Sequence, residues 1–478
     1  MKTIVEKPKE VPVFADADVI VVGGGPAGIG AALAAARIGA KTILLETSNC
    51  LGGMQTQCMN PRFAGVDPDI VGGIILDIIN RLKKYDAIFD IAREKSDVDP
   101  FLGPVYTFDA ESYKYLLDEM MEEAGVEIFY HALAVSAVKE ENAIKGVIIE
   151  SKEGRHAILG KVVIDSTGSG DIVWKSGIKC MPVGFPDGPQ KGRHMGFSYG
   201  FNIRGVDLDR FEAFRQEHPE EWGSLTCGAE LVKKARAEGK LYGNRSAFPI
   251  GNLDTGTISM MGPYYGLRLG HHGWLLKDLS DGERDCRKQA WSAYTLLKNN
   301  VPGFENSHIE QTPTHLFLRD MHRILGEYVL KEEDIRLGKA FDDSITVSNA
   351  LPDVFGPDHQ HKLYGDVPPF DIPYRCLLPQ ETDNLLTAGS TISADLITYA
   401  AVRYCTPSVC TGQAAGTAAA LAARNNVTPR KLDVKLVQAT LRKEGIPISV
   451  QDLSKAVLNR YGEKIEFRKK NLMLLEPD

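Results

Sequence analysis

The chain has 478 residues, which is too long for one compact core and indicates two or three lobes. Its formal net charge of −8 argues against a general nucleic-acid binder and against a protein of anionic membrane surfaces. The first residues are polar and lack the apolar core of a signal peptide, so we expect a cytoplasmic protein without a membrane span.

The first predicted elements form a strand–helix–strand unit. Val19–Val22 and Ile43–Leu45 are apolar runs that predict buried parallel strands, and the alanine-rich stretch Ala27–Arg37 between them predicts a helix. A unit of this kind binds a dinucleotide when the turn before its helix is rich in glycine.

Three glycines of that turn follow the G-x-G-x-x-G spacing. Gly23 permits the tight turn, Gly25 lets backbone amides approach a pyrophosphate, and Gly28 lets the helix lie close to the strand. Glu46 ends the second strand 18 residues beyond Gly28, close to the ~20 expected for a carboxylate that binds a ribose hydroxyl. The contacts expected from this unit are Gly23, Gly25, Pro26, Ala27, Gly28 and Glu46. The same fingerprint serves NAD and FAD, so later segments must decide between them.

Further elements follow in chain order. The stretch LGGMQT at 51–56 places glycines just past the second strand. Ser112–Ala124 predicts an amphipathic helix, and Glu127–Tyr130 predicts a strand. Val135–Glu140, Ala143–Glu150 and Ala157–Asp165 predict a β-meander, whose last strand enters the turn STGSGD.

The next region mixes strand and helix patterns. Phe197–Ile203 predicts a strand, and Gly282–Asn299 predicts a helix. The stretch DNLLTAGS at 383–390 predicts another strand, which ends in a turn of small residues. It is followed by TGQAAGTAAALAA at 411–423, a helix of small side chains, and then by a charged tail with helical segments at Val434–Glu444 and Val450–Asn459.

Together these segments resemble FAD-dependent oxidoreductases with the glutathione-reductase-like FAD fold, and most closely a widespread bacterial family of them. The resemblance runs from about Asp16 to Arg424 and includes an R-x-x-x-R-x-x-G-x-Y segment at 319–328. It implies that the D-x-T-G strand lies beside the adenosine, and that the A-G strand and a turn at Gly412–Gly416 reach the flavin ring. A helix N-terminus at that turn would stabilise negative charge on the reduced flavin. The FAD contacts implied by these later segments are Gly53, Met54, Thr56, Thr167, Gly168, Gly389, Gly412, Ala414 and Ala415.

The resemblance favours FAD over NAD. No second G-x-G-x-x-G follows a predicted strand, so a separate NAD(P)H domain is not expected. The predicted fold is α/β: a Rossmann-type FAD-binding domain with a parallel sheet and a β-meander, an inserted α+β substrate lobe, and a helical C-terminal tail. We assign the FAD domain to 16–60, 105–185 and 330–425, the substrate lobe to 61–104 and 186–329, and the tail to 426–478.

No metal site is expected. None of the eight cysteines forms a C-x-x-C pair, so zinc and iron–sulfur sites lack their ligand spacing. Cys405 and Cys410 have the spacing of a redox pair, but we favour buried thiols in a reducing compartment. Asp358, His359 and His361 lack a further convincing ligand for a metal.

Catalytic candidates come from two segments near the C-terminal half. GPDHQH at 356–361 resembles a P-x-D-x-H stretch of the family, which makes His359 a candidate base, with His361 as the alternative. The family's arginine, histidine and glutamate after the last strand are replaced here by Ser390, Leu396 and Ile397. This leaves Tyr399 as a candidate proton donor and Arg403 as a candidate anchor for an anionic or oxygen-rich group.

The function predicted from the sequence is hydride transfer from a small organic substrate, for which a hydroxylated carbon is one candidate, to flavin N5. The alternatives are a reductase of an activated alkene and a non-redox tRNA-modifying or scaffold flavoprotein, which the acidic charge disfavours. The expected partners are a small-molecule substrate and an electron acceptor that the sequence does not identify. Nucleic acid and membrane are not expected, and a homo-oligomer stays open.

Overall fold

The largest sheet of the protein combines parallel strands with a meander. The computed structural model describes residues 2–89, 105–219, 228–243, 248–253, 256–266, 272–356 and 361–472. This sheet has seven strands. The parallel part runs in the order β6 (Glu127–Phe129), β2 (Thr42–Leu45), β1 (Val13–Val22), β9 (Gly154–Asp165) and β18 (Leu385–Thr387). Since β1 and β2 are buried along their paired residues, they read as apolar runs in the sequence.

The meander is built on the first half of β9. Strands β7 (Leu133–Glu140) and β8 (Ala143–Ser151) pair antiparallel, and β8 continues antiparallel onto β9. The second half of β9 pairs with β18 instead, so one long strand joins the meander to the parallel sheet. The α/β class with a parallel sheet and a β-meander, predicted from the sequence, is confirmed.

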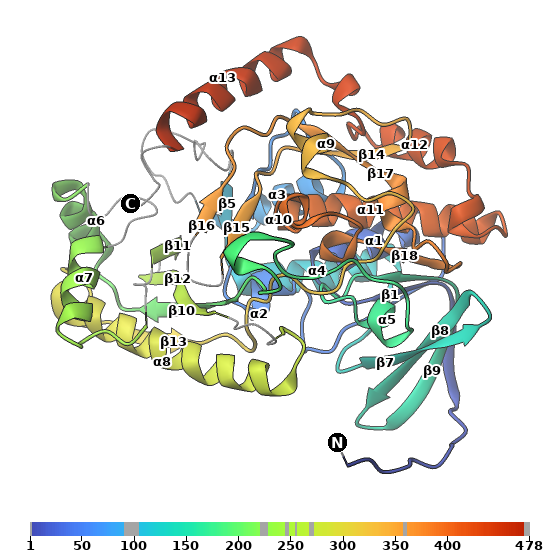
Figure 1. Ribbon diagram of the computed structural model, residues 1–478, viewed down its shortest axis with the longest axis horizontal. Helices are drawn as coiled ribbons and strands as arrows, with labels where there is room; N and C mark the ends of the chain where they lie inside the picture. Colours follow the sequence, from blue (N-terminus) through green and yellow to red (C-terminus); the bar gives the residue numbers. More distant parts are fainter. Residues whose placement is uncertain are drawn as a thin grey trace.

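Two helices cross closely beside the parallel strands (Figure 1). They are α1 (Pro26–Arg37) and α11 (Cys405–Arg424). A Cβ added at Gly412 would overlap the carbonyl oxygen of Ala27, and one added at Gly416 would overlap that of Ala31. The small residues of α11 therefore let two helix backbones approach each other. We expected them to serve close approach to a cofactor, and that interpretation is wrong for these glycines.

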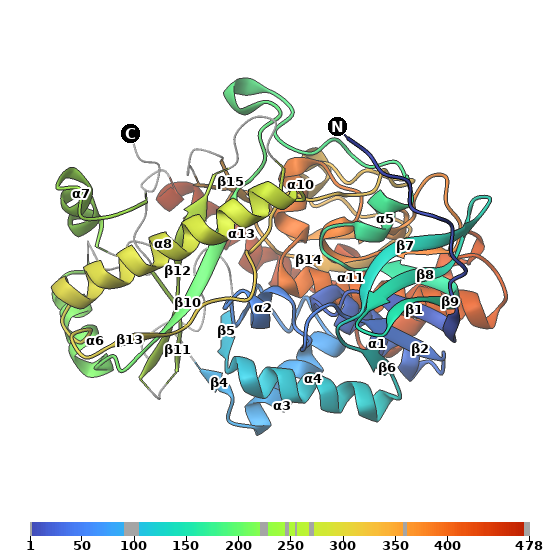
Figure 2. The ribbon, with the colours of Figure 1, turned by 90° about the horizontal axis from the view of Figure 1, so that it is seen from below.

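A second, antiparallel sheet lies beside the first. It contains β11 (Phe248–Leu253), β12 (Thr257–Tyr265), β10 (Phe197–Arg204) and β13 (His308–Gln311) in that order. The long helix α8 (Leu276–Asn300) packs across β10 and β12 (Figure 2), and α6 (Leu208–Glu217) and α7 (Ala229–Ala237) lie at the same end of the molecule. All of these elements come from the range assigned to the substrate lobe, whose boundaries stay a prediction.

The remaining described helices and strands complete the body of the fold. The helices are α2 (Met54–Gln57), α3 (Ile74–Lys84), α4 (Ala110–Ala124), α5 (Asp171–Lys175), α9 (Glu332–Arg336) and α10 (Leu396–Val402). The strands are β3 (Arg62–Ala64), β4 (Ile88–Phe89), β5 (Val105–Phe108), β14 (Ser344–Ser348), β15 (Asp353–Phe355), β16 (His361–Leu363) and β17 (Phe370–Pro373).

The C-terminal tail folds back on the body. It contains α12 (Val434–Lys443) and α13 (Lys455–Leu472). Asp67 holds α13 through Arg460 at 2.7 Å and Tyr461 at 2.9 Å. The helix expected at 450–459 begins later than predicted, because Ser449 and Asp452 form a capping box around a short 3₁₀ turn. Among the described residues, no helix combines the length and the apolar character needed to cross a membrane.

Candidate functional site

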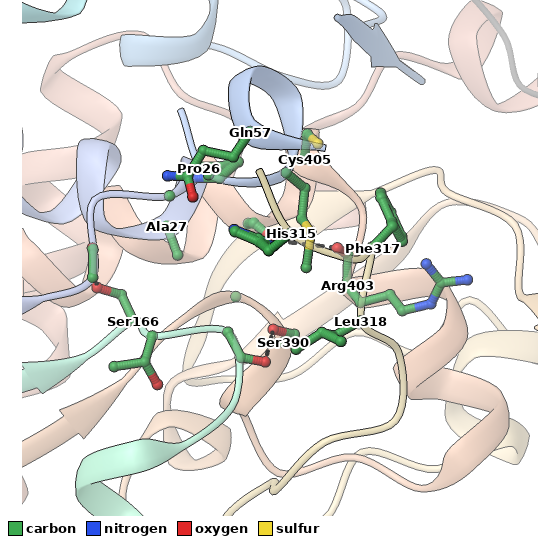
Figure 3. A pocket seen from close by; sticks show the side chains of 18 of the residues that line it. Pro26, Ala27, Gln57, Ser166, His315, Phe317, Leu318, Ser390, Arg403 and Cys405 are labelled. Carbon is green, nitrogen blue, oxygen red and sulfur yellow. Dashed lines mark hydrogen bonds between the residues drawn. The ribbon is translucent and has the colours of Figure 1, made fainter. Parts of the chain in front are cut away.

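A cavity of about 500 Å³ lies at the carboxyl ends of the parallel strands. Its wall includes Val22–Gly23 after β1, Leu45–Glu46 after β2, Ser166–Gly168 after β9, and Ala388–Ser390 after β18. Ligands of open α/β sheets bind at this edge, where the turns after the strands expose backbone groups. Figure 3 shows Ala27 and Ser166 toward one end of the cavity and Arg403 and Cys405 toward the other.

Two glycines of the first glycine turn have different roles: Gly28 serves packing, and Gly25 serves binding. A Cβ at Gly28 would overlap the carbonyl oxygen of Gly23, so Gly28 lets α1 lie against the turn. Gly23 itself has φ +97°, a conformation that favours glycine. By contrast, a Cβ at Gly25 would have only the Cα of Gly53 nearby, at 3.9 Å. Gly25 lines the cavity and caps α1, so its missing side chain leaves space for a phosphate at the helix N-terminus.

Glu46 is buried at the cavity and already holds the turn together. Its Oε2 accepts a hydrogen bond from the backbone N–H of Gly24 at 2.7 Å, and its Oε1 accepts one from that of Ser48 at 2.7 Å. Each carboxylate oxygen has a second lone pair, so the same side chain can still accept from a ribose hydroxyl. Glu46 thus connects the first glycine turn to the segment after β2.

The other residues predicted for the adenosine and pyrophosphate side fall into two groups. Pro26, Ala27, Gly53 and Met54 line the cavity, as do Thr167 and Gly168. Thr56 is buried behind the wall, where its hydroxyl donates to the carbonyl oxygen of Leu51 at 2.8 Å. Thr56 therefore shapes the second glycine turn from behind.

The last strand and α11 close the opposite end. Gly389, with φ +68°, lines the cavity directly after β18. The expected turn at Gly412–Gly416 is wrong: these residues, with Ala414 and Ala415, lie inside α11 and are buried against α1. The N-terminus of α11 is at Cys405, and Tyr404, Cys405 and Ser408 are the parts of it that line the cavity. The helix dipole therefore reaches the cavity from a position seven residues before Gly412.

Tyr399 lies on α10 and borders the cavity, but it is buried and engaged. Its hydroxyl accepts a hydrogen bond from the backbone N–H of Asp320 at 2.9 Å. The Arg323 guanidinium lies over its ring, 4.5 Å from the centroid. Burial raises the pKa of Tyr399 above its ordinary value, which makes it a reluctant proton donor. Its role in proton transfer stays a prediction.

Arg403 also borders the cavity, and it forms a structural ion pair. Its guanidinium donates to the carbonyl oxygen of Asp353 at 2.8 Å and lies 3.3 Å from the Asp353 carboxylate. The Arg403 side chain is 7% exposed. The third catalytic candidate, His359, lies outside the described residues.

His315 is a cavity residue that the sequence did not single out as catalytic (Figure 3). Its Nδ1 is 3.0 Å from the carbonyl oxygen of Leu316, which can only accept, so Nδ1 carries the proton. The same nitrogen lies 3.3 Å from Cys58 Sγ, which donates to the His315 carbonyl oxygen at 3.2 Å. In this tautomer Nε2 keeps a free lone pair. The sequence around His315, which continues as LFLRD, contains no motif. Only the contacts with Leu316 and Cys58 in the folded protein indicate a role for it.

Cys58 supports His315 as a neutral thiol. It is fully buried, and burial, with the nearby Glu283 carboxylate, raises its pKa well above the ordinary value for a thiol. Burial likewise raises the pKa of Cys405 to about 12 and of Cys410 to about 12. The described cysteines are free thiols, and five of them are buried.

Two further polar residues line the end of the cavity where His315 lies. Arg62 begins β3, and Asn60 lies in the segment between α2 and β3. The Oδ1 atom of Asn60 is buried and has no hydrogen-bond partner among the described residues. The groups of His, Cys, Asp and Glu in the described part of the chain do not form a cluster that could hold a metal ion.

Comparison with known proteins matches residues 18–441 to the family model of FAD dependent oxidoreductases. The thiamine thiazole synthase of Methanococcus maripaludis strain C5 is 31% identical over 161 residues, which are 32% of this chain and 56% of that protein. Digeranylgeranylglycerophospholipid reductase 1 of Methanopyrus kandleri is 29% identical over 158 residues, 32% of this chain and 39% of that protein.

These matches cover only part of each relative. The chain spans just over half the length of the thiazole synthase and less than half of the reductase.

Among solved structures, a geranylgeranyl bacteriochlorophyll reductase-like protein of Thermoplasma acidophilum aligns over 95% of this chain and 99% of its own, with 13% identity and a TM-score of 0.44.

Proposed function

Since the chain belongs to the FAD-dependent oxidoreductase family and is a FAD-dependent enzyme, we propose that it oxidises a small organic substrate by hydride transfer to flavin N5. The substrate of this proposal carries a hydroxyl on the carbon that loses the hydride. The product is then a carbonyl compound, and the hydroxyl proton must leave to a base. When bound, FAD supplies the two-electron acceptor for the hydride.

The residues of the glycine turn fit the phosphate part of FAD. Gly25 leaves space at the N-terminus of α1, where unpaired backbone N–H groups and the positive end of the helix dipole favour a pyrophosphate. Glu46 lies beside this turn at the end of β2, where it can accept from a ribose hydroxyl.

His315 is the base of this proposal. The observation that carries the assignment is its tautomer: Nδ1 donates to the Leu316 carbonyl oxygen, so Nε2 is left to accept a proton. The ring lies in the cavity wall at the end where α11 begins. Cys58 holds the ring in place without competing for protons, because its own pKa is raised by burial. An oriented neutral imidazole of this kind contributes about 10²–10⁴-fold to a rate.

The test is anaerobic mixing of the FAD-loaded protein with small alcohols and hydroxy acids, followed by the absorption of the oxidised flavin. We expect one of these donors to bleach the flavin and His315→Gln to slow the bleaching by about 100-fold or more. The matched control is His308→Gln, because His308 is an exposed histidine on β13.

Two outcomes would contradict the proposal. If no donor bleaches the flavin but an activated alkene reoxidises dithionite-reduced protein rapidly, the enzyme works as a reductase. If neither reaction occurs, a non-redox role of the flavoprotein replaces both. If a donor bleaches the flavin equally fast in His315→Gln and in the wild type, the reaction stands but His315 is not its base.

A further inference from the structure

Arg62 differs from the other arginines of the cavity. Arg403 pairs with Asp353, and Arg319 donates to Ser198 Oγ at 2.6 Å. The guanidinium of Arg62 forms no ion pair or hydrogen bond within the described part of the chain, although its residue lines the cavity and is only partly exposed. A positive charge without a partner among the described residues therefore borders the cavity.

The backbone fixes where this charge lies. The Thr406 hydroxyl donates to the carbonyl oxygen of Ala64 at 2.7 Å, which joins β3 to the first turn of α11. The backbone N–H of Thr314 donates to the carbonyl oxygen of Gln57 at 2.9 Å, which joins the segment before β3 to the segment of His315. Arg62 is thus held at the end of the cavity formed by the start of α11 and by His315.

An anion from another molecule can satisfy the charge at this end. The charged part of oxidised FAD is its pyrophosphate, which the N-terminus of α1 at Gly25 would hold. The oxidised flavin ring is neutral and does not compensate a guanidinium. A guanidinium at the wall of a cavity forms charge-assisted hydrogen bonds with an anion that enters it, so an anion from another molecule is a suitable partner of Arg62.

The neighbours of Arg62 narrow the chemistry of that anion. A guanidinium binds a carboxylate through two parallel hydrogen bonds. The unpartnered Oδ1 of Asn60 can accept from a hydroxyl, and Nε2 of His315 can take its proton. A cation, an acceptor and a base at one end of the cavity match a small molecule that carries both a carboxylate and a hydroxyl.

We propose that the substrate is a small hydroxy acid whose carboxylate binds Arg62. The proposal rests on the proposed function for the role of the hydroxyl, whereas the carboxylate site can be tested without turnover.

The experiment titrates the FAD-loaded protein with propionate and with propionamide, which match in size but differ in charge. Binding is followed by the flavin absorption spectrum and by calorimetry. We expect propionate to bind about tenfold or more tightly than propionamide in the wild type, the scale of a hydrogen bond to a charged group. Arg62→Gln should abolish this preference, and Arg62→Lys should keep part of it. The matched control is Arg210→Gln, because the Arg210 side chain is 57% exposed and lies on α6.

Equal affinity for the two probes in the wild type, or an undiminished preference in Arg62→Gln, would overturn the proposal. It would also be wrong if Arg62→Gln lowered the flavin midpoint potential while propionate affinity stayed unchanged, because Arg62 would then serve the reduced flavin. Since neither probe needs to react, the titration stays decisive even if no donor ever bleaches the flavin. Failure of the hydride-transfer function and failure of the carboxylate site are therefore distinguishable.

Discussion

The two ends of the cavity are built in different ways. At the nucleotide end, the turn Gly23–Gly28 and Glu46 lie within one strand–helix–strand unit, and a single hydrogen bond from Gly24 to Glu46 joins them. At the other end, His315, Arg62 and Arg403 come from three separate segments. They meet only because the chain between them folds into a second sheet and returns.

This difference determines which substitutions each end of the cavity can tolerate. The nucleotide end depends on backbone shape, since glycines there allow contacts that any side chain would block. The opposite end depends on side-chain partners, since its charged and polar groups differ in whether the protein satisfies them. Substitutions at the first end should therefore act through the fold or the cofactor, and those at the second through stability or substrate.

The largest effect is expected for Gly28→Ala. The added methyl group would overlap the carbonyl oxygen of Gly23, a backbone atom that cannot move without separating α1 from β1. The overlap, at 1.8 Å, is far closer than ordinary overpacking, so we expect a loss of unfolding free energy well beyond the ~1–3 kcal/mol typical of overpacking, together with loss of FAD. Urea unfolding measures this change. The control is Gly462→Ala, an exposed position in α13 where an added Cβ meets nothing within 4 Å. Equal unfolding curves for Gly28→Ala and the wild type would contradict the packing role.

Gly25→Val should separate the cofactor from the fold. Gly25 has φ −75°, which any residue adopts, and its Cβ would have no heavy atom closer than 3.9 Å. The apoprotein should therefore unfold at nearly the wild-type urea concentration, whereas the isopropyl group fills the space of the pyrophosphate. We expect the purified variant to be colourless, as judged by the flavin absorption after reconstitution with FAD. A yellow variant with normal stability would show that the phosphate lies elsewhere.

Arg403→Ala tests the opposite end. The sequence analysis gives Arg403 as a candidate anchor for an anionic or oxygen-rich group, and loss of such an anchor would slow flavin reduction but leave FAD bound. The buried pair with Asp353 changes the expectation, because removing one partner of such a pair costs about 3–5 kcal/mol. We expect the melting temperature and the bound FAD to fall together, as measured by a thermal melt and by flavin absorption. Arg62→Gln is the contrast, since it removes a cation that pairs with none of the described residues and should leave the melt nearly unchanged. Normal melting of Arg403→Ala would assign its guanidinium to the substrate instead.

The same contrast explains how much the sequence could predict. The glycine turn, the strands around it and Glu46 are close in sequence, and their spacing alone indicates a dinucleotide site. Arg62 and His315 are separated by 253 positions, and no local pattern shows that the two segments meet. The prediction of a turn at Gly412–Gly416 near the flavin was wrong for a related reason. A glycine-rich helix reads alike whether it approaches a cofactor or, as here, another helix. Asp395 caps α10, and α11 starts after Tyr404 beyond the turn between these two helices, which spacing does not reveal.

Beside the turn after β9, a column of aromatic rings provides a smaller test. His322 stacks on Trp174 with ring centroids 4.3 Å apart and lies tilted against Trp274, also at 4.3 Å. Its Nδ1 donates to the carbonyl oxygen of Ser169 at 3.1 Å, while its Nε2 is buried without a hydrogen-bond partner among the described residues. Protonation would place an unsatisfied charged N–H in this column, and burial accordingly lowers the pKa of His322.

The direction of the pH effect follows from this lowered pKa. In the unfolded chain His322 takes up a proton near its ordinary pKa of about 6.5, whereas in the folded protein it resists protonation until a lower pH. The stability contributed by the neutral ring is therefore present above about pH 6.5 and is lost as the pH falls, by at most about 1.4 kcal/mol per pH unit for one group. His322→Phe keeps a flat ring between the tryptophans but cannot be protonated. Its unfolding free energy should fall less than that of the wild type between about pH 7.5 and about pH 5.5. If both proteins lost the same free energy over this range, His322 would be protonated in the folded state as easily as in the unfolded chain, and the column would have to offer Nε2 a partner such as water.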